Sequence, residues 1–388
     1  MIPLQFRTLI VHLCLFLAFF LPIYSWSQYL LVLIPILLYV TVSDKKIYLG
    51  WNYIVVVSLF LSILFNSFWL IPDNYKSLYK VINLLVLFSL FPYINYKNVY
   101  IRRWFVVMMI CLVIFTQLVW LLGFQPIIKL LDSIYPTTVS YGQIGVDLSL
   151  NIGGRYGGIF HNPNDCSRNV TILTAMYLVL SGREKRTDIL VLFLMGFSIF
   201  LTGSRTGIMM FVATVSIYIL NQESITKKKK IIILSAILSV LALIFIYAVG
   251  DNTRVKSLTL NVGKSERLYY IVEILTKTFK NPIEFAFGNF YQERLSVLGF
   301  GFSGGFDSDL GNLIYYYGLA SFTCLLTFIF SLYRKTGKIF LYCLPPHIVM
   351  ASTGLFTSFY SAIMIFMLYS MCYIESERSK ELSNVENE

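Results

Sequence analysis

Charged side chains that could do chemistry gather in three segments of an otherwise apolar chain. The first segment, from Arg155 to Asp165, contains a Gly-Gly pair and an Asn-Pro-Asn turn. The second reads Leu-Thr-Gly-Ser-Arg-Thr-Gly at 201–207, and the third, 250–310, closes on an Asp-Ser-Asp triplet. All three segments contain arginine, so the chemistry that they indicate first is the binding of an anion.

Arginine suits a phosphate or pyrophosphate ligand better than any other side chain. Its guanidinium binds phosphate oxygens through paired hydrogen bonds and does not lose its charge. When a glycosidic bond to pyrophosphate breaks, negative charge develops on the leaving group, and fixed cations stabilise that transition state. Arginines that supply this charge replace a metal ion, so we expect no metal and no cofactor. The candidate arginines are Arg155, Arg205, Arg254, Arg267 and Arg294.

The polar residues beside these arginines have both chemical and structural interpretations. Asp307 and Asp309 could take a proton from a sugar hydroxyl, or they could form only an Asx turn and a helix cap. Asn164 and Ser204 are each placed to cap the helix that follows, beside the ligand. Arg205 could reach into a cavity or simply extend to the membrane surface.

The elements that carry these residues are predicted to be membrane-spanning helices. Hydrophobic residues make up 57% of the 388 residues and charged residues only 13%, whereas a soluble domain has about 25% charged residues. Segments near the length of a span, roughly 20 apolar residues, recur along the chain. We expect about twelve, at 8–24, 28–43, 48–71, 79–95, 104–123, 165–181, 187–203, 206–221, 230–249, 311–332, 338–354 and 356–373.

Basic residues orient these spans. Short loops with lysine and arginine stay on the cytoplasmic side, and every second short loop here is basic. These loops and tails contain Arg7; Lys45 and Lys46; Lys97, Arg102 and Arg103; Arg183, Lys185 and Arg186; Lys227 to Lys230; Arg334, Lys335 and Lys338; Arg378 and Lys380. Both termini are therefore predicted to be cytoplasmic and all three polar segments to lie on the outer side. The net charge of +11 orients helices, and no nucleic-acid partner is expected.

The predicted organisation is an all-α polytopic membrane protein with two long outer loops. The second loop contains an amphipathic pattern from Ser265 to Phe279, which predicts a helix at the membrane surface or against the bundle. The segments are five helices in 1–123, the first outer loop in 124–164, four helices in 165–249, the second outer loop in 250–310, three helices in 311–373 and a cytoplasmic tail in 374–388.

Taken in order, the polar segments resemble the O-antigen polymerase (Wzy) and O-antigen ligase superfamily over about Arg155 to Ser321. The Thr-Gly-Ser-Arg-Thr-Gly turn is the most specific element. The matching motifs are Arg155-x-x-Gly158 with Asn162-Pro163-Asn164; 201–207; Ser265-Glu266-Arg267; Asn281-Pro282 with Phe287-Gly288; and Asp307-Ser308-Asp309 before Tyr317-Gly318-Leu319.

The resemblance implies a metal-independent glycosyltransferase of the bacterial inner membrane. It implies that a growing glycan moves from undecaprenyl pyrophosphate to the next lipid-linked repeat unit, with Arg205 and Arg267 holding pyrophosphate and Asp307 or Asp309 facing the acceptor. Membrane lipids and a chain-length-determining co-polymerase are the other expected partners. Ligases carry His-Asn where this chain has Asp307-Ser308, which favours a polymerase. A ligase acting on lipid A–core and a flippase for lipid-linked oligosaccharide are the alternatives.

Overall fold

The computed structural model describes residues 4–21, 33–34, 36–39, 52–67, 75–90, 101–135, 156–160, 163–184, 189–222, 225–233, 235, 282–288, 309–348 and 359–386. Regular structure within these ranges is entirely helical. The named elements are α1 (Leu4–Phe20), α3 (Asn52–Ser67), α4 (Tyr75–Leu90), α5 (Arg103–Leu121), α6 (Gln125–Ile134), α8 (Pro163–Glu184), α9 (Ile189–Leu201), α10 (Arg205–Asn221), α14 (Pro282–Phe287), α16 (Asp309–Thr336), η4 (Gly337–Cys343), α17 (Leu344–Ile348) and α18 (Phe359–Glu386).

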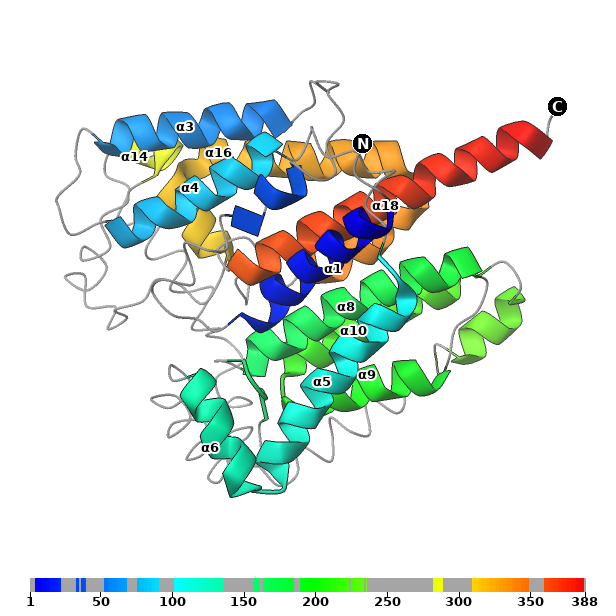
Figure 1. Ribbon diagram of the computed structural model, residues 1–388. Helices are drawn as coiled ribbons and strands as arrows, with labels where there is room; N and C mark the ends of the chain where they lie inside the picture. The colour runs from blue at the N-terminus through cyan, green and yellow to red at the C-terminus, as the bar shows by residue number, and fades with distance from the viewer. Residues whose placement is uncertain are drawn as a thin grey trace, which may run out of the picture.

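The helices form two groups that meet at a shared centre. Figure 1 shows α5, α8, α9 and α10 packed together, with α3, α4, α14 and α16 in a second group. Helices α1 and α18 lie between the groups, and α18 contacts both α8 and α16. Every residue from Cys166 to Ser181 in α8 and from Ser361 to Cys372 in α18 is buried. These two helices are therefore the core on which the others pack.

Two helical stretches are long and apolar enough to cross a membrane. They are Arg103–Leu121 and Leu313–His347. Large apolar side chains are exposed on the outward faces of several helices, among them Trp104, Phe115 and Phe193. A broad exposed apolar surface marks contact with lipid or with another protein.

The predicted helical segments around the polar clusters coincide with observed helices. The segments 104–123, 165–181, 187–203 and 206–221 correspond to α5, α8, α9 and α10. The division of the stretch after Thr187 into two helices is confirmed, because α9 ends at Leu201 and α10 begins at Arg205.

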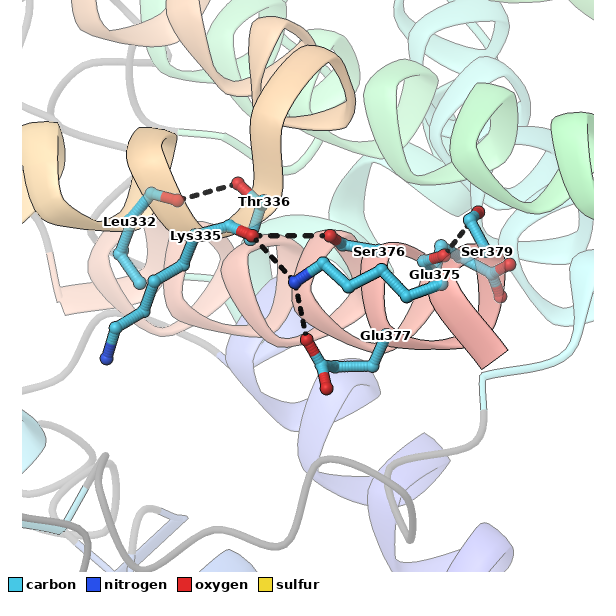
Figure 2. A network of polar contacts seen from close by, with 8 residues as sticks. Leu332, Lys335, Thr336, Glu375, Ser376, Glu377 and Ser379 are labelled. Carbon is cyan, nitrogen blue, oxygen red and sulfur yellow. Dashed lines mark hydrogen bonds and ion pairs between the residues drawn. The ribbon is translucent and has the colours of Figure 1, made fainter. Parts of the chain in front are cut away.

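Helix α18 continues through most of the segment predicted as a cytoplasmic tail, as far as Glu386. Figure 2 shows the reason: Ser376 Oγ and Lys380 Nζ both donate to the Lys335 carbonyl oxygen near the end of α16, at 3.4 and 3.3 Å. The last carbonyls of a helix have no partner within that helix. The C-terminal part of α18 supplies such a partner to α16. Within α18 itself, a Lys380–Glu377 ion pair of 2.9 Å stabilises the helical turn.

The segment 124–164 contains an amphipathic helix that the sequence did not predict. Helix α6 has Pro126 in its first turn, where proline is tolerated, and it buries Ile128. Tyr135, which follows it, donates its hydroxyl to the Phe20 carbonyl at 2.7 Å, and burial raises its pKa to about 12. The amphipathic helix predicted for 265–279 lies outside the described residues.

Candidate functional site

The backbone beside Arg155 is joined to the turn that precedes Arg205. Tyr156 N donates to the Leu201 carbonyl at 2.7 Å. From α5, the buried Gln117 donates to the carbonyls of Tyr156 and Ser198, both at 3.0 Å, and accepts from Ser198 Oγ at 2.7 Å. One side chain therefore links α5, α9 and the first polar segment.

Gly158 allows this segment to approach α5, and Gly157 allows its own tight turn. Gly158 has a φ of +64°, and a Cβ there would lie 2.5 Å from Thr116 Oγ1. Phe160 N donates to the Gly157 carbonyl at 3.1 Å and closes a tight turn. The prediction that these glycines permit a close backbone approach is confirmed, because any larger residue at 158 would collide with α5.

The second polar segment forms a capped turn between α9 and α10. Ser204 is the N-cap of α10, and its Oγ accepts from Gly207 N at 3.1 Å, as its position predicted. Arg205 is consequently the first residue of α10. A Cβ at Gly207 would lie 2.3 Å from Ser167 Cβ, so the first turn of α10 packs tightly against the N-terminal part of α8.

Asn164, predicted to cap α8, is the second residue of that helix. The helix begins one residue earlier, at Pro163, because the fixed φ of proline suits the first helical position. Asn164 lies within the first turn, where its carbonyl accepts from Ser167 Oγ at 2.9 Å.

A charged residue that sequence reasoning left without a role, Arg168, is buried beside this junction. Its side chain is 1% exposed, and its Nη2 lies 2.9 Å from Asp165 Oδ1. Its Nε donates at 2.8 Å to Ser361 Oγ in the first turn of α18. The available signal was an arginine in a segment predicted to span the membrane, where charge is costly and tends to mark function.

The α14 and α16 motifs of the family resemblance also meet, through glycines. Gly318 interrupts α16 with φ 79° and ψ 167°, and a Cβ there would lie 2.2 Å from the Ala286 carbonyl oxygen in α14. A Cβ at Gly288 would lie 2.2 Å from the Tyr316 carbonyl oxygen. The end of α14 is also held by α3, because Ser62 Oγ donates to the Phe287 carbonyl at 2.5 Å.

The junction of α8, α10 and α18 brings helix N-termini together with the charged pair Arg168 and Asp165. The Ser167–Gly207 and Arg168–Ser361 contacts bring the N-terminal turns of all three helices together. Each helix N-terminus carries a partial positive charge and unpaired N–H groups, which together favour an anion. The full positive charge of the Arg168 guanidinium lies beside these N-termini.

The structure brings only part of the predicted site together. Ser204, Arg205 and Asn164 lie at the α8–α10 junction, and Asp309 is the first residue of α16. The remaining candidates lie outside the described residues: Arg155, Arg254, Arg267, Arg294 and Asp307. Within the described ranges, no three His, Cys, Asp or Glu side chains are grouped so that they could hold a metal ion.

Comparison with known proteins adds no relative to this picture. No protein-family model matches the chain, and no curated protein matches it. The function must therefore be argued from the chain's own residues.

Proposed function

We propose that the protein is a surface-polysaccharide polymerase of the bacterial inner membrane. It transfers a growing glycan from undecaprenyl pyrophosphate to the next lipid-linked repeat unit on the outer face. The observation that carries the proposal is the contact between the segment after Arg155 and the turn before Arg205, through the 2.7 Å hydrogen bond from Tyr156 to Leu201. Two of the motifs that resemble the polymerase family, the segment after Arg155 and the Thr-Gly-Ser-Arg-Thr-Gly turn, meet beside helix N-termini that favour a pyrophosphate.

The contacts between helices support the proposed orientation of alternating spans. Arg103, predicted to be cytoplasmic, donates from Nη2 to Tyr177 Oη at 2.5 Å, in the later part of the predicted span 165–181. The Lys335 carbonyl accepts from Ser376, and both of these residues are predicted to be cytoplasmic. Segments predicted to be outer also contact one another, as Tyr156 and Leu201 do. An arrangement of about twelve spans with both termini inside accounts for both sets of contacts.

In the proposed reaction, Arg205 and Arg267 hold the pyrophosphate of the donor. The glycosidic oxygen leaves with the pyrophosphate as the acceptor hydroxyl attacks the anomeric carbon. Asp307 or Asp309 accepts the hydroxyl proton. Fixed guanidinium and helix-terminal charge stabilise the departing pyrophosphate without reorganisation, so this scheme uses no metal and no cofactor.

Deleting the gene and separating the surface glycans on a gel tests this proposal. If the protein is a polymerase, the deletion strain makes lipid A–core that bears a single repeat unit. Bare core with polymer stranded on the carrier would instead identify a ligase. Any result other than core with a single repeat unit contradicts the polymerase.

One observation favours a flippase as the second candidate. The break of α16 at Gly318 resembles the discontinuous helices at which transporters bind their substrates. Repeat units that accumulate on the inner leaflet of the deletion strain would support this function over a transferase.

A further inference from the structure

Arg168 has more hydrogen-bonding capacity than its neighbours use. Its Nε donates to Ser361 Oγ, and the Ser361 hydroxyl in turn donates to Asn169 Oδ1 at 2.8 Å, so its lone pair is directed to the arginine. Among the residues that the structure describes, Nη1 is buried and has no acceptor. A guanidinium carries several N–H groups in a planar fork, and most of this fork is unused.

The charge of Arg168 is only partly compensated. Asp165 lies 2.9 Å from Nη2 but is 36% exposed, against 1% for the arginine, and the contact does not have hydrogen-bond geometry. A buried charge is costly unless it is well paired and its donors are satisfied. A purely structural role at this position would be filled as well by an apolar side chain of similar size.

The guanidinium lies beside the N-terminal parts of three helices. Arg168 is in the second turn of α8 but reaches back to Asp165 and across to the first turn of α18, as side chains that lean toward a helix N-terminus do. The neighbouring Ser167 lies against Gly207 in the first turn of α10. The free N–H groups of Arg168 therefore lie beside the N-termini of α8, α10 and α18.

We propose that Arg168 is an anion-binding residue and that Asp165 is the internal anion it holds until a phosphate-bearing ligand arrives. The incoming phosphate or pyrophosphate group exchanges with the Asp165 carboxylate, which is already partly in contact with solvent. No covalent bond changes in this step. Only the identity of the anion rests on the proposed function; the exchange itself rests on the Arg168, Asp165 and Ser361 contacts.

The test is calorimetric titration of the purified full-length protein with inorganic pyrophosphate and, separately, with farnesyl pyrophosphate. We expect Arg168→Gln to weaken binding by about tenfold, the loss of one charge-assisted contact. Arg168→Lys should weaken it less, because an ammonium keeps the charge but not the fork. Asp165→Asn should tighten binding about threefold, since it removes the competing carboxylate.

Arg103→Gln is the matched control. Arg103 also contacts α8, but at Tyr177, near the opposite end of the helix, and its removal should leave anion binding unchanged. If Arg168→Gln fails to fold, Asp165→Asn and Arg168→Lys decide the question. Unchanged affinity in folded Arg168→Gln, weaker affinity in Asp165→Asn, or no binding of either probe to the wild type overturns the inference.

The two probes separate the sources of the anion. Arg168-dependent binding of both probes supports a subsite for the phosphate group itself, and such binding of farnesyl pyrophosphate alone supports a lipid-linked ligand. Neither measurement involves glycan transfer. If the protein binds the anion but its deletion leaves the polymer intact, this inference stands and the polymerase is refuted. If the deletion abolishes the polymer but the protein binds no anion, the polymerase stands and this inference is refuted.

Discussion

The α8–α10 junction and the α14–α16 junction bring motifs together by different means. Around the first, side chains make the contacts: Gln117 of α5 binds Ser198 of α9 and the Tyr156 backbone, and Ser204 caps α10. At the second, Gly288 and Gly318 let two backbones touch. The first junction retains polar groups that can serve a ligand, whereas the second is closely packed and fixes geometry.

This difference indicates how each junction should respond to mutation. Hydrogen bonds through side chains can be removed one at a time, at a moderate cost each. A close backbone contact at a glycine with positive φ cannot be weakened in small steps. Any substitution there adds a Cβ that both collides with the neighbouring backbone and strains the chain. We therefore expect the largest loss of stability at the second junction and the largest loss of function at the first.

Gly318→Ala should have the largest effect on stability. Its Cβ would lie 2.2 Å from the Ala286 carbonyl oxygen at a φ that only glycine adopts easily, so we expect a loss of more than about 4 kcal/mol. Gly337→Ala is the control, since it has a φ of +60° but nothing within 4 Å of its Cβ, and should lose about 1 kcal/mol. Unfolding in mixed detergent micelles measures both; equal losses would contradict the contact.

Gln117→Leu should follow, with a loss of about 3 kcal/mol, because it leaves the Tyr156 carbonyl and the Ser198 groups without their partner. Thr214→Val removes a hydroxyl that bonds only within α10 and should change little. A double-mutant cycle with Ser198→Ala measures the coupling. Additive losses would show that the two side chains do not act together.

Gly207→Ala should cost about 2 kcal/mol, because the new methyl group overpacks the α8–α10 contact. Ser167→Gly removes the atoms that it would meet and should restore most of the loss in the double variant. The same unfolding assay compares the three proteins. A double variant less stable than Gly207→Ala would mean that the helices do not touch at this point.

Ser204→Ala should have the smallest effect, about 1 kcal/mol, from loss of the N-cap of α10. Ser133→Ala, on the exposed side of α6, is the control and should leave the melting temperature unchanged. If both variants melt alike, Ser204 contributes nothing as a cap.

The helices were predictable where the apolar pattern was long, and the contacts between them were not. The cap at Ser204 and the close backbone approach at Gly158 were interpreted correctly, because both follow from the residue types in one short segment. No role was predicted for Arg168, because its role depends on a contact with Ser361 in α18. No local sequence pattern reveals that contact. The helical tail and α6 were missed for the same reason, since Lys335 and Phe20 hold them from a distance.

Reconstitution tests the central claim most directly. Purified protein in nanodiscs receives lipid-linked repeat units isolated from the deletion strain, and the products are separated by size. We predict a ladder that grows by whole repeat units, its loss in Arg205→Ala, and an unchanged ladder in Arg103→Gln. A wild-type protein that makes nothing longer than one unit, or a full ladder from Arg205→Ala, would contradict the account.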